Sequence, residues 1–291
     1  MPLSIYSQLE QRCIDWASTQ SAIRAVIVVG SRARSEHPAD EWSDLDLVVF
    51  ATDTAPYFND AMWLETFGHV RVAVSSSFGK SDREWLALYD DGGKLDAAFL
   101  STDPTATATL QEMLDTFPYP VVLQRGTRVL VDKTIDRESQ GALRLPKSDE
   151  PHWPTRAEFA TAINRMLLDA IKTAKFIRRN DLWQAKQMCD GEMKQRLLTM
   201  LEWQALAQQD QRDVWYDGRF LNEWAAGEAL AALPGTFAAY QAADLQRAFF
   251  ATLDLFRRLA LAVATQLGYA YPAEADQFVT RQLQSILRGT A

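Results

Sequence analysis

The spacing of apolar residues changes once along this 291-residue chain. In the first part, short β-branched runs at 24–29 and 45–51 alternate with stretches of helical spacing, which predicts strands and helices in one α/β domain. Beyond a polar, proline-containing stretch at 133–154, only helical spacing is found. We therefore expect an α/β domain over residues 1–145 and, after a linker, a helical bundle over residues 146–291.

Individual elements follow from the same periodicities. In the first domain we expect helices over 3–20, 55–67 and 107–117, strands over 24–29, 45–51, 69–74 and 94–100, a short helix or extended run over 81–89, and a strand pair around a turn over 121–132. In the second domain we expect helices over 156–179, 182–206, 219–231, 235–267 and 275–288. Asp91-Gly92-Gly93 predicts a hairpin turn, and Thr155 with Glu158 predicts a capping box.

Charge and composition narrow the class of partner. The net charge is −8, whereas proteins that bind nucleic acid usually present a basic face, so we expect no nucleic-acid partner. An acidic chain suits a cationic small molecule. The two cysteines lie in apolar helical patterns and have no zinc-site spacing. With no signal-peptide pattern and no apolar stretch of about 18 residues, we expect a cytoplasmic protein without a membrane partner.

A polar constellation follows the first predicted strand. Gly30 would let a phosphate approach the main chain closely, and the Ser31 hydroxyl could hydrogen-bond phosphate oxygens. Asp44 and Asp46 are two residues apart on a strand, so both point to one face. Two carboxylates about 4 Å apart would repel by roughly 4 kcal/mol at an effective dielectric of about 20, which favours a cation between them. The combination predicts a metal–nucleotide site rather than an exposed strand with two solvated acids.

A third acid, Asp96, lies on the polar face of the predicted strand 94–100, together with Lys94. If this strand adjoins that of Asp46, three acids converge. Magnesium prefers a few carboxylates with substrate phosphates and water, and two such ions could clamp the oxygens of a phosphoryl transfer. Asp96 could be a metal ligand, a general base, or both. We interpret Lys94 as offsetting the acidic charge.

The pattern of Gly30-Ser31, Asp44-x-Asp46 and Asp96 resembles the nucleotidyltransferase superfamily, which has the polymerase-beta-like fold. More narrowly, the chain is similar to the aminoglycoside 6-adenylyltransferases, the streptomycin adenylyltransferase family. That similarity is carried by the segments GSRAR, WSDLDLVVF, MWLETFGHV, DDGGKLDAAFL, PTRAEF, LLTMLEW and YAYPAE. These segments cover both expected domains in order.

The resemblance implies a nucleotidyltransferase domain with a mixed sheet and helices, followed by a helical substrate-binding domain. It implies ATP as co-substrate, magnesium as cofactor with two ions, and transfer of AMP to a hydroxyl of an aminoglycoside such as streptomycin, with release of pyrophosphate. The residues that match the metal-binding and catalytic acids are Asp44, Asp46 and Asp96. Those that match or could reach the nucleotide phosphates are Gly30, Ser31, Arg32 and Lys175. Because streptomycin is cationic, acidic contacts are expected, with Glu65, Asp169, Asp190 and Glu192 as candidates.

Two alternatives stay open at this point. One keeps nucleotidyl transfer but changes the acceptor to a lincosamide, another metabolite, or a protein or tRNA end. The other is a non-catalytic nucleotide-binding module, against which the retention of three repelling carboxylates argues. We expect a monomer or a weak homodimer. Neither the acceptor hydroxyl nor the role of Asp96 follows from the residues alone.

Overall fold

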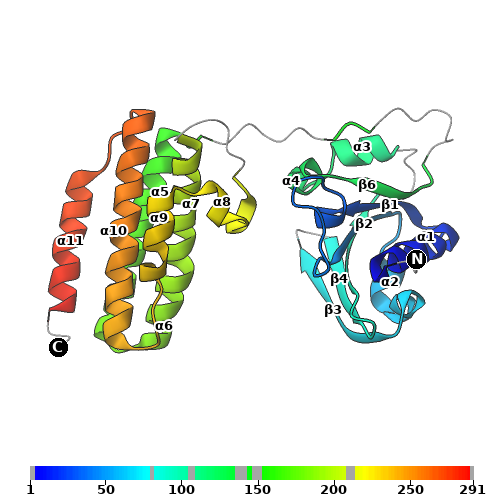
Figure 1. Ribbon diagram of the computed structural model, residues 1–291, viewed down its shortest axis with the longest axis horizontal. Helices are drawn as coiled ribbons and strands as arrows, with labels where there is room; N and C mark the ends of the chain where they lie inside the picture. The colour runs from blue at the N-terminus through cyan, green and yellow to red at the C-terminus, as the bar shows by residue number, and fades with distance from the viewer. Residues whose placement is uncertain are drawn as a thin grey trace. The chain divides into compact units, whose positions relative to one another are not determined.

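The computed structural model describes residues 4–78, 82–103, 109–134, 143–145, 153–207 and 214–288. The chain forms two compact units, Met1–Asp149 and Glu150–Ala291 (Figure 1). The most polar part of the expected linker, residues 147–150, lies outside the described residues. The assignment of residues 1–145 and 146–291 to nucleotidyl transfer and substrate binding stays a prediction.

The first unit is built on a six-stranded mixed sheet in the order β3-β4-β5-β2-β1-β6. The strands are β1 (Ile23–Val29), β2 (Leu45–Ala51), β3 (Val70–Phe78), β4 (Asp82–Tyr89), β5 (Lys94–Ser101) and β6 (Arg128–Asp132). β2 and β5 are parallel, and the other neighbouring pairs are antiparallel. The α/β class and the mixed sheet are therefore confirmed.

Each face of the sheet has its own buried core. The helical segments are α1 (Ile5–Thr19), η1 (Gly30–Arg32), α2 (Ala55–Asn59), η2 (Met62–Phe67), α3 (Leu110–Asp115) and α4 (Pro120–Gln124). Aromatic and aliphatic residues of α1, α2 and η2 pack on one face, where Leu45 and Leu47 of β2 are buried. α3 and α4 pack on the opposite face, against Val48 and Phe50. Because side chains alternate along β2, Asp46 points to the same face as Val48 and Phe50, which is the face covered by α3 and α4.

Two expectations for the first unit need correction, and one alternative is settled. The helix expected over 55–67 is broken, because Asp60 is extended and its carboxylate accepts the main-chain N–H of Met62 at 2.9 Å. The first half of the strand pair expected over 121–132 is instead the helix α4, which begins at Pro120 and buries Leu123. The stretch 81–89, left open between helix and strand, is the strand β4. The Asp91-Gly92-Gly93 turn is confirmed between β4 and β5.

The second unit is helical throughout its described residues, as predicted. Its elements are α5 (Arg156–Arg178), α6 (Leu182–Gln187), the π-helical turn η4 (Met188–Glu192), α7 (Met193–Ala207), η5 (Tyr216–Gly218), α8 (Leu221–Trp224), α9 (Gly227–Ala232), η6 (Leu233–Thr236), α10 (Ala242–Leu267) and α11 (Ala273–Leu287). The predicted capping box of Thr155 and Glu158 opens α5. The helix expected over 219–231 is split at the extended Ala225, and α10 begins seven residues later than expected, after the 3-10 turn η6.

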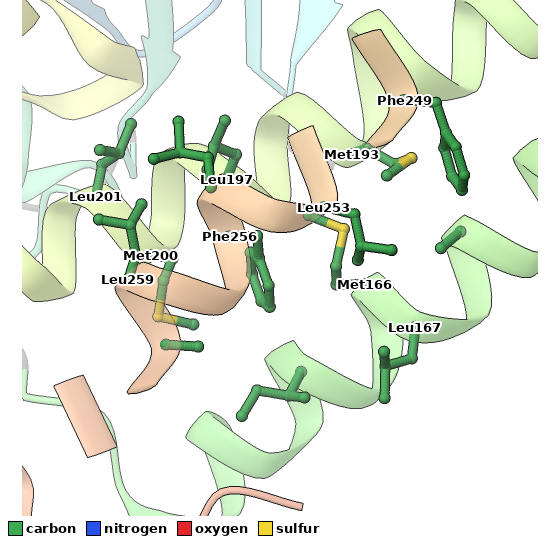
Figure 2. Close-up of a cluster of buried hydrophobic side chains, with 14 of the residues drawn as sticks. Met166, Leu167, Met193, Leu197, Met200, Leu201, Phe249, Leu253, Phe256 and Leu259 are labelled. Carbon is green, nitrogen blue, oxygen red and sulfur yellow. The ribbon is translucent and has the colours of Figure 1, made fainter. Parts of the chain in front are cut away.

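Long amphipathic helices form the core of this unit. α10 packs against α5 and α7, and α11 packs against α5. Figure 2 shows the aliphatic, methionine and phenylalanine side chains that α5, α7 and α10 bury together. None of the helices in the described ranges is both long and apolar enough to cross a membrane.

Candidate active site

The turn after β1 brings the main chain against an acidic side chain. Val29 ends β1 and pairs with Asp46 of β2. Gly30 follows with φ of +68°, in the left-handed region that favours glycine. A Cβ at this position would overlap Oδ2 of Asp46. Glycine is therefore what allows the Gly30–Arg32 turn and the Asp46 carboxylate to lie side by side.

Arg32 anchors the segment that leads into β2. Its Nε donates to the carbonyl of Asp44 at 3.0 Å and its Nη2 donates to the carbonyl of Ser43 at 2.6 Å. The guanidinium also lies 3.5 Å from the ring centroid of Tyr6. These contacts hold Asp44 in place at the start of β2. Contact of Arg32 with a phosphate stays a prediction.

Two of the three predicted acids are register partners on adjacent strands. β2 and β5 run parallel, and Asp46 lies directly opposite Asp96. Their neighbours Leu45 and Leu95 pair on the buried opposite face. The adjacency of the two strands, on which convergence of the acids depends, is confirmed.

Lys94 bridges Asp96 to the remaining predicted acid, Asp44. Its Nζ lies 2.6 Å from Oδ2 of Asp44, and 2.9 Å and 3.0 Å from Oδ1 and Oδ2 of Asp96. Burial alone would lower the pKa of Lys94, but its hydrogen bonds to both carboxylates raise that pKa overall. Burial raises the pKa of Asp96; Asp44 and Glu84 raise it further, whereas Lys94 opposes the shift. The interpretation of Lys94 as a counter-charge is confirmed by these contacts.

The same acids have the chemistry of a magnesium site. Among the described residues, no three His, Cys, Asp or Glu side chains gather into a group that could hold a metal ion, and the cation shared by Asp44 and Asp96 is the ammonium of Lys94. Oδ1 of Asp96 is buried, and its contact is the ion pair with the Lys94 ammonium at 2.9 Å. Hard oxygen donors of this type suit magnesium, so the residues fit the ion by their chemistry.

Glu84 is a fourth acid on this face, and it was not among the residues predicted from the sequence. Leu86 of β4 pairs with Asp96 of β5, so Glu84, two residues earlier, points to the same face. The hydroxyl of Ser76 donates to its Oε1 at 2.6 Å. The signal that could have found Glu84 is its position directly before the apolar run of residues 85–89, which becomes informative once that stretch is assigned to a strand.

The four remaining predicted acids already have contacts of their own. In the first unit, Glu65 accepts the main-chain N–H of Val70 and lies 3.4 Å from His69. In the second unit, Lys175 is exposed on α5. Three acids there are paired with cations: Asp169 and Glu192 each with Arg196 at 3.4 Å, and Asp190 with Lys186 at 2.5 Å and Lys194 at 3.7 Å. An aminoglycoside contact by any of these acids would have to compete with these partners.

The second unit contains an acid with a shifted pKa that no motif indicated. Burial in α7 raises the pKa of Glu202 to about 7, and the charge of Asp217 adds to the shift. The pKa of a glutamate in an unfolded chain is about 4.3, so the folded chain binds the proton of Glu202 more tightly than the unfolded chain does. The resulting stabilisation is complete below that pH and is lost as the pH rises through about 7.

We therefore expect the free energy of unfolding to fall between about pH 5 and pH 8, and Glu202→Gln to reduce that fall by staying neutral throughout. Urea denaturation at both pH values measures the free energy of unfolding. The exposed Glu274, changed to glutamine, is the matched control and should leave the pH dependence as it is. An equal fall in the Glu202→Gln and wild-type proteins would contradict the prediction.

Similarity to known proteins extends over almost the whole chain. The family model described as streptomycin adenylyltransferase matches residues 5–286. An aminoglycoside 6-adenylyltransferase of Bacillus subtilis (strain 168) is 24% identical over 285 residues, covering 94% of each chain. One of Campylobacter jejuni is 23% identical over 284 residues, covering 92% of each chain. The solved structure of an aminoglycoside 6-adenyltransferase from Bacillus subtilis is 20% identical, with a TM-score of 0.45 over 99% of this chain and 100% of that chain.

Proposed function

The chain belongs to the streptomycin adenylyltransferase family, and from this premise we propose that it transfers AMP from Mg-ATP to a hydroxyl of an aminoglycoside, releasing pyrophosphate. Membership makes it an enzyme of the nucleotidyltransferase class. The observation that carries the proposal is the register of Asp46 with Asp96 on parallel strands, beside the Gly30–Arg32 turn. Streptomycin is the acceptor we propose first.

The acids would hold the nucleotide's metal and receive a proton. Asp44, Asp46 and Asp96 would supply the carboxylate ligands, and magnesium bound there would neutralise charge on the triphosphate. The hydroxyl and main-chain amides at Ser31 would contact phosphate oxygens. In the transfer, the acceptor oxygen forms a bond to the α-phosphorus, the bond from that phosphorus to the pyrophosphate oxygen breaks, and the hydroxyl proton passes to a base.

Asp96 is suited to be that base. Its pKa is raised by burial, so its carboxylate is a stronger base than that of an ordinary aspartate. It belongs to neither hydrophobic core, and its side chain is 27% exposed. In this position Asp96 could act as the general base or as a metal ligand. Mn²⁺ binding by the Asp96→Asn variant distinguishes the two roles.

The acceptor is proposed from charge. A chain of net charge −8 attracts a cationic substrate, and streptomycin carries two guanidinium groups. The helical unit is proposed to supply part of the acceptor site, with Asp169, Asp190 and Glu192 as candidate contacts and Lys175 as a contact for the triphosphate. Glu65 is the candidate from the first unit.

The test is transfer of label from α-labelled ATP to streptomycin in the presence of magnesium. We expect labelled streptomycin and free pyrophosphate, and we expect Asp44→Asn to abolish both. Reactions without acceptor measure hydrolysis. Absence of label transfer to any member of an aminoglycoside panel would refute the acceptor class, and transfer to a lincosamide would identify the alternative acceptor. Magnesium-dependent ATP binding without any turnover would instead indicate a non-catalytic module.

A further inference from the structure

The contacts of Lys94 carry an inference beyond charge compensation. Lys94 opens β5, directly after the hairpin turn, and reaches an acid 50 residues away in sequence, Asp44, as well as its near neighbour Asp96. The first contact is 2.6 Å and the second 3.0 Å, so one ammonium lies between two carboxylates that the proposed reaction assigns to a metal ion. The ammonium and the ion cannot occupy the same place.

The ammonium of Lys94 neutralises only part of the negative charge around it. Asp44 and Asp96 carry two negative charges against the one ammonium of Lys94, and Glu84 adds a further negative charge felt by Asp96. The guanidinium of Arg32 donates its hydrogen bonds to the main-chain carbonyls of Ser43 and Asp44. A divalent cation would therefore neutralise more of the local charge than Lys94 does.

Exposure makes the exchange feasible. The side chains of Lys94, Asp44 and Asp96 are 37%, 35% and 27% exposed, so solvent and ions reach them. Ion pairs with this much exposure contribute little to stability, and the four-carbon stem of lysine moves readily. Lys94 can leave the acids without disturbing the strand, because main-chain pairing with Leu88 of β4 fixes its backbone.

We propose that Lys94 is an exchangeable counter-ion of the acidic pair Asp44 and Asp96. In the nucleotide-free protein its ammonium joins the two carboxylates and prevents them from repelling each other. It leaves them when a divalent cation takes over their charge, so it weakens binding of a metal ion that arrives without nucleotide. This inference rests on the proposed function only in assigning these acids to a divalent cation.

The test measures Mn²⁺ binding to protein free of nucleotide and acceptor. Lys94→Met keeps the length of the side chain and removes the charge, and we expect its dissociation constant for Mn²⁺ to fall by about tenfold relative to wild type. Lys94→Arg keeps the charge and is the matched control, with a dissociation constant near that of wild type. Wild-type or weaker affinity in Lys94→Met, with or without loss of thermal stability, would overturn the proposal.

A second measurement uses the unmodified side chains, in case Lys94→Met does not fold. In the wild-type protein, Mn²⁺ should speed acetylation of Lys94 by an amine-reactive reagent, as followed by mass spectrometry of peptides. Lys133 is the internal control, because its ammonium donates to the carbonyls of Ala17 and Gln20 and faces no acid of the site. Unchanged labelling of Lys94 at saturating Mn²⁺ would overturn the exchange. Failure of AMP transfer alone would leave both results intact, since neither needs ATP or an acceptor.

Discussion

Asp96→Asn is expected to lower kcat/KM for AMP transfer by about 10²–10⁴-fold, the usual contribution of a positioned general base. Asparagine has nearly the same shape, and Asp96 is held by strand pairing with β2 and β4, so the fold should persist. The loss follows because an amide can neither accept the proton of the acceptor hydroxyl nor bind a cation as a carboxylate does. Steady-state kinetics with α-labelled ATP at several acceptor concentrations gives the value.

The same variant separates the two roles of Asp96. If Asp96 is the base only, Mn²⁺ affinity should stay near wild type while kcat falls; if it is a ligand, the dissociation constant for Mn²⁺ should rise in parallel. Asp115→Asn is the matched control, an exposed acid of α3 in the same unit that is hydrogen-bonded only to Gln111 among the described residues, and it should retain wild-type kinetics. A kcat/KM for Asp96→Asn close to that of this control would contradict any catalytic role.

Features set by local periodicity were predictable from the sequence. β2 coincides with the expected 45–51 run, because its apolar residues are buried on both faces except where Asp46 interrupts the pattern. The orientation of Asp46 away from its neighbours Leu45 and Leu47 follows from the two-residue repeat of a strand, which needs no tertiary information. The capping box at Thr155 was predictable for the same reason, since both of its hydrogen bonds join residues three apart.

Features set by contacts between distant segments were not predictable. The bridge from Lys94 to Asp44 exists because β5 pairs in parallel with β2, and a single sequence does not specify which strands become neighbours. Glu84 was missed for the same reason, since its place on the acidic face depends on β4 lying beside β5. The helix α4 was mistaken for a strand because Val121 and Val122 favour strands, whereas Pro120 and the buried Leu123 determine the local structure.

The helical unit shows the same limit in a different form. The helix expected over 182–206 is continuous, but it contains the π-helical turn η4, and a 3.6-residue pattern cannot show one inserted residue. A Cβ at Gly191 in that turn would meet none of the described atoms within 4 Å beyond the helix's own backbone, so close packing does not require this glycine. Asp190 beside it is held instead by Lys186 and Lys194.

The largest effect on stability is expected from Phe256→Ala in α10, about 3–5 kcal/mol in the free energy of unfolding. Phe256 is 1% exposed, and Figure 2 shows it among the buried side chains of α7 and α10, including Met200 and Leu259. Truncation removes its apolar surface from the core and leaves a cavity that long, mutually packed helices fill poorly. Urea denaturation followed by circular dichroism measures the loss, with Phe278→Ala as the control.

Phe278 is 56% exposed on α11, and its truncation should change stability by about 0.5 kcal/mol or less. Similar losses for the two variants would mean that Phe256 is not part of a tightly packed core.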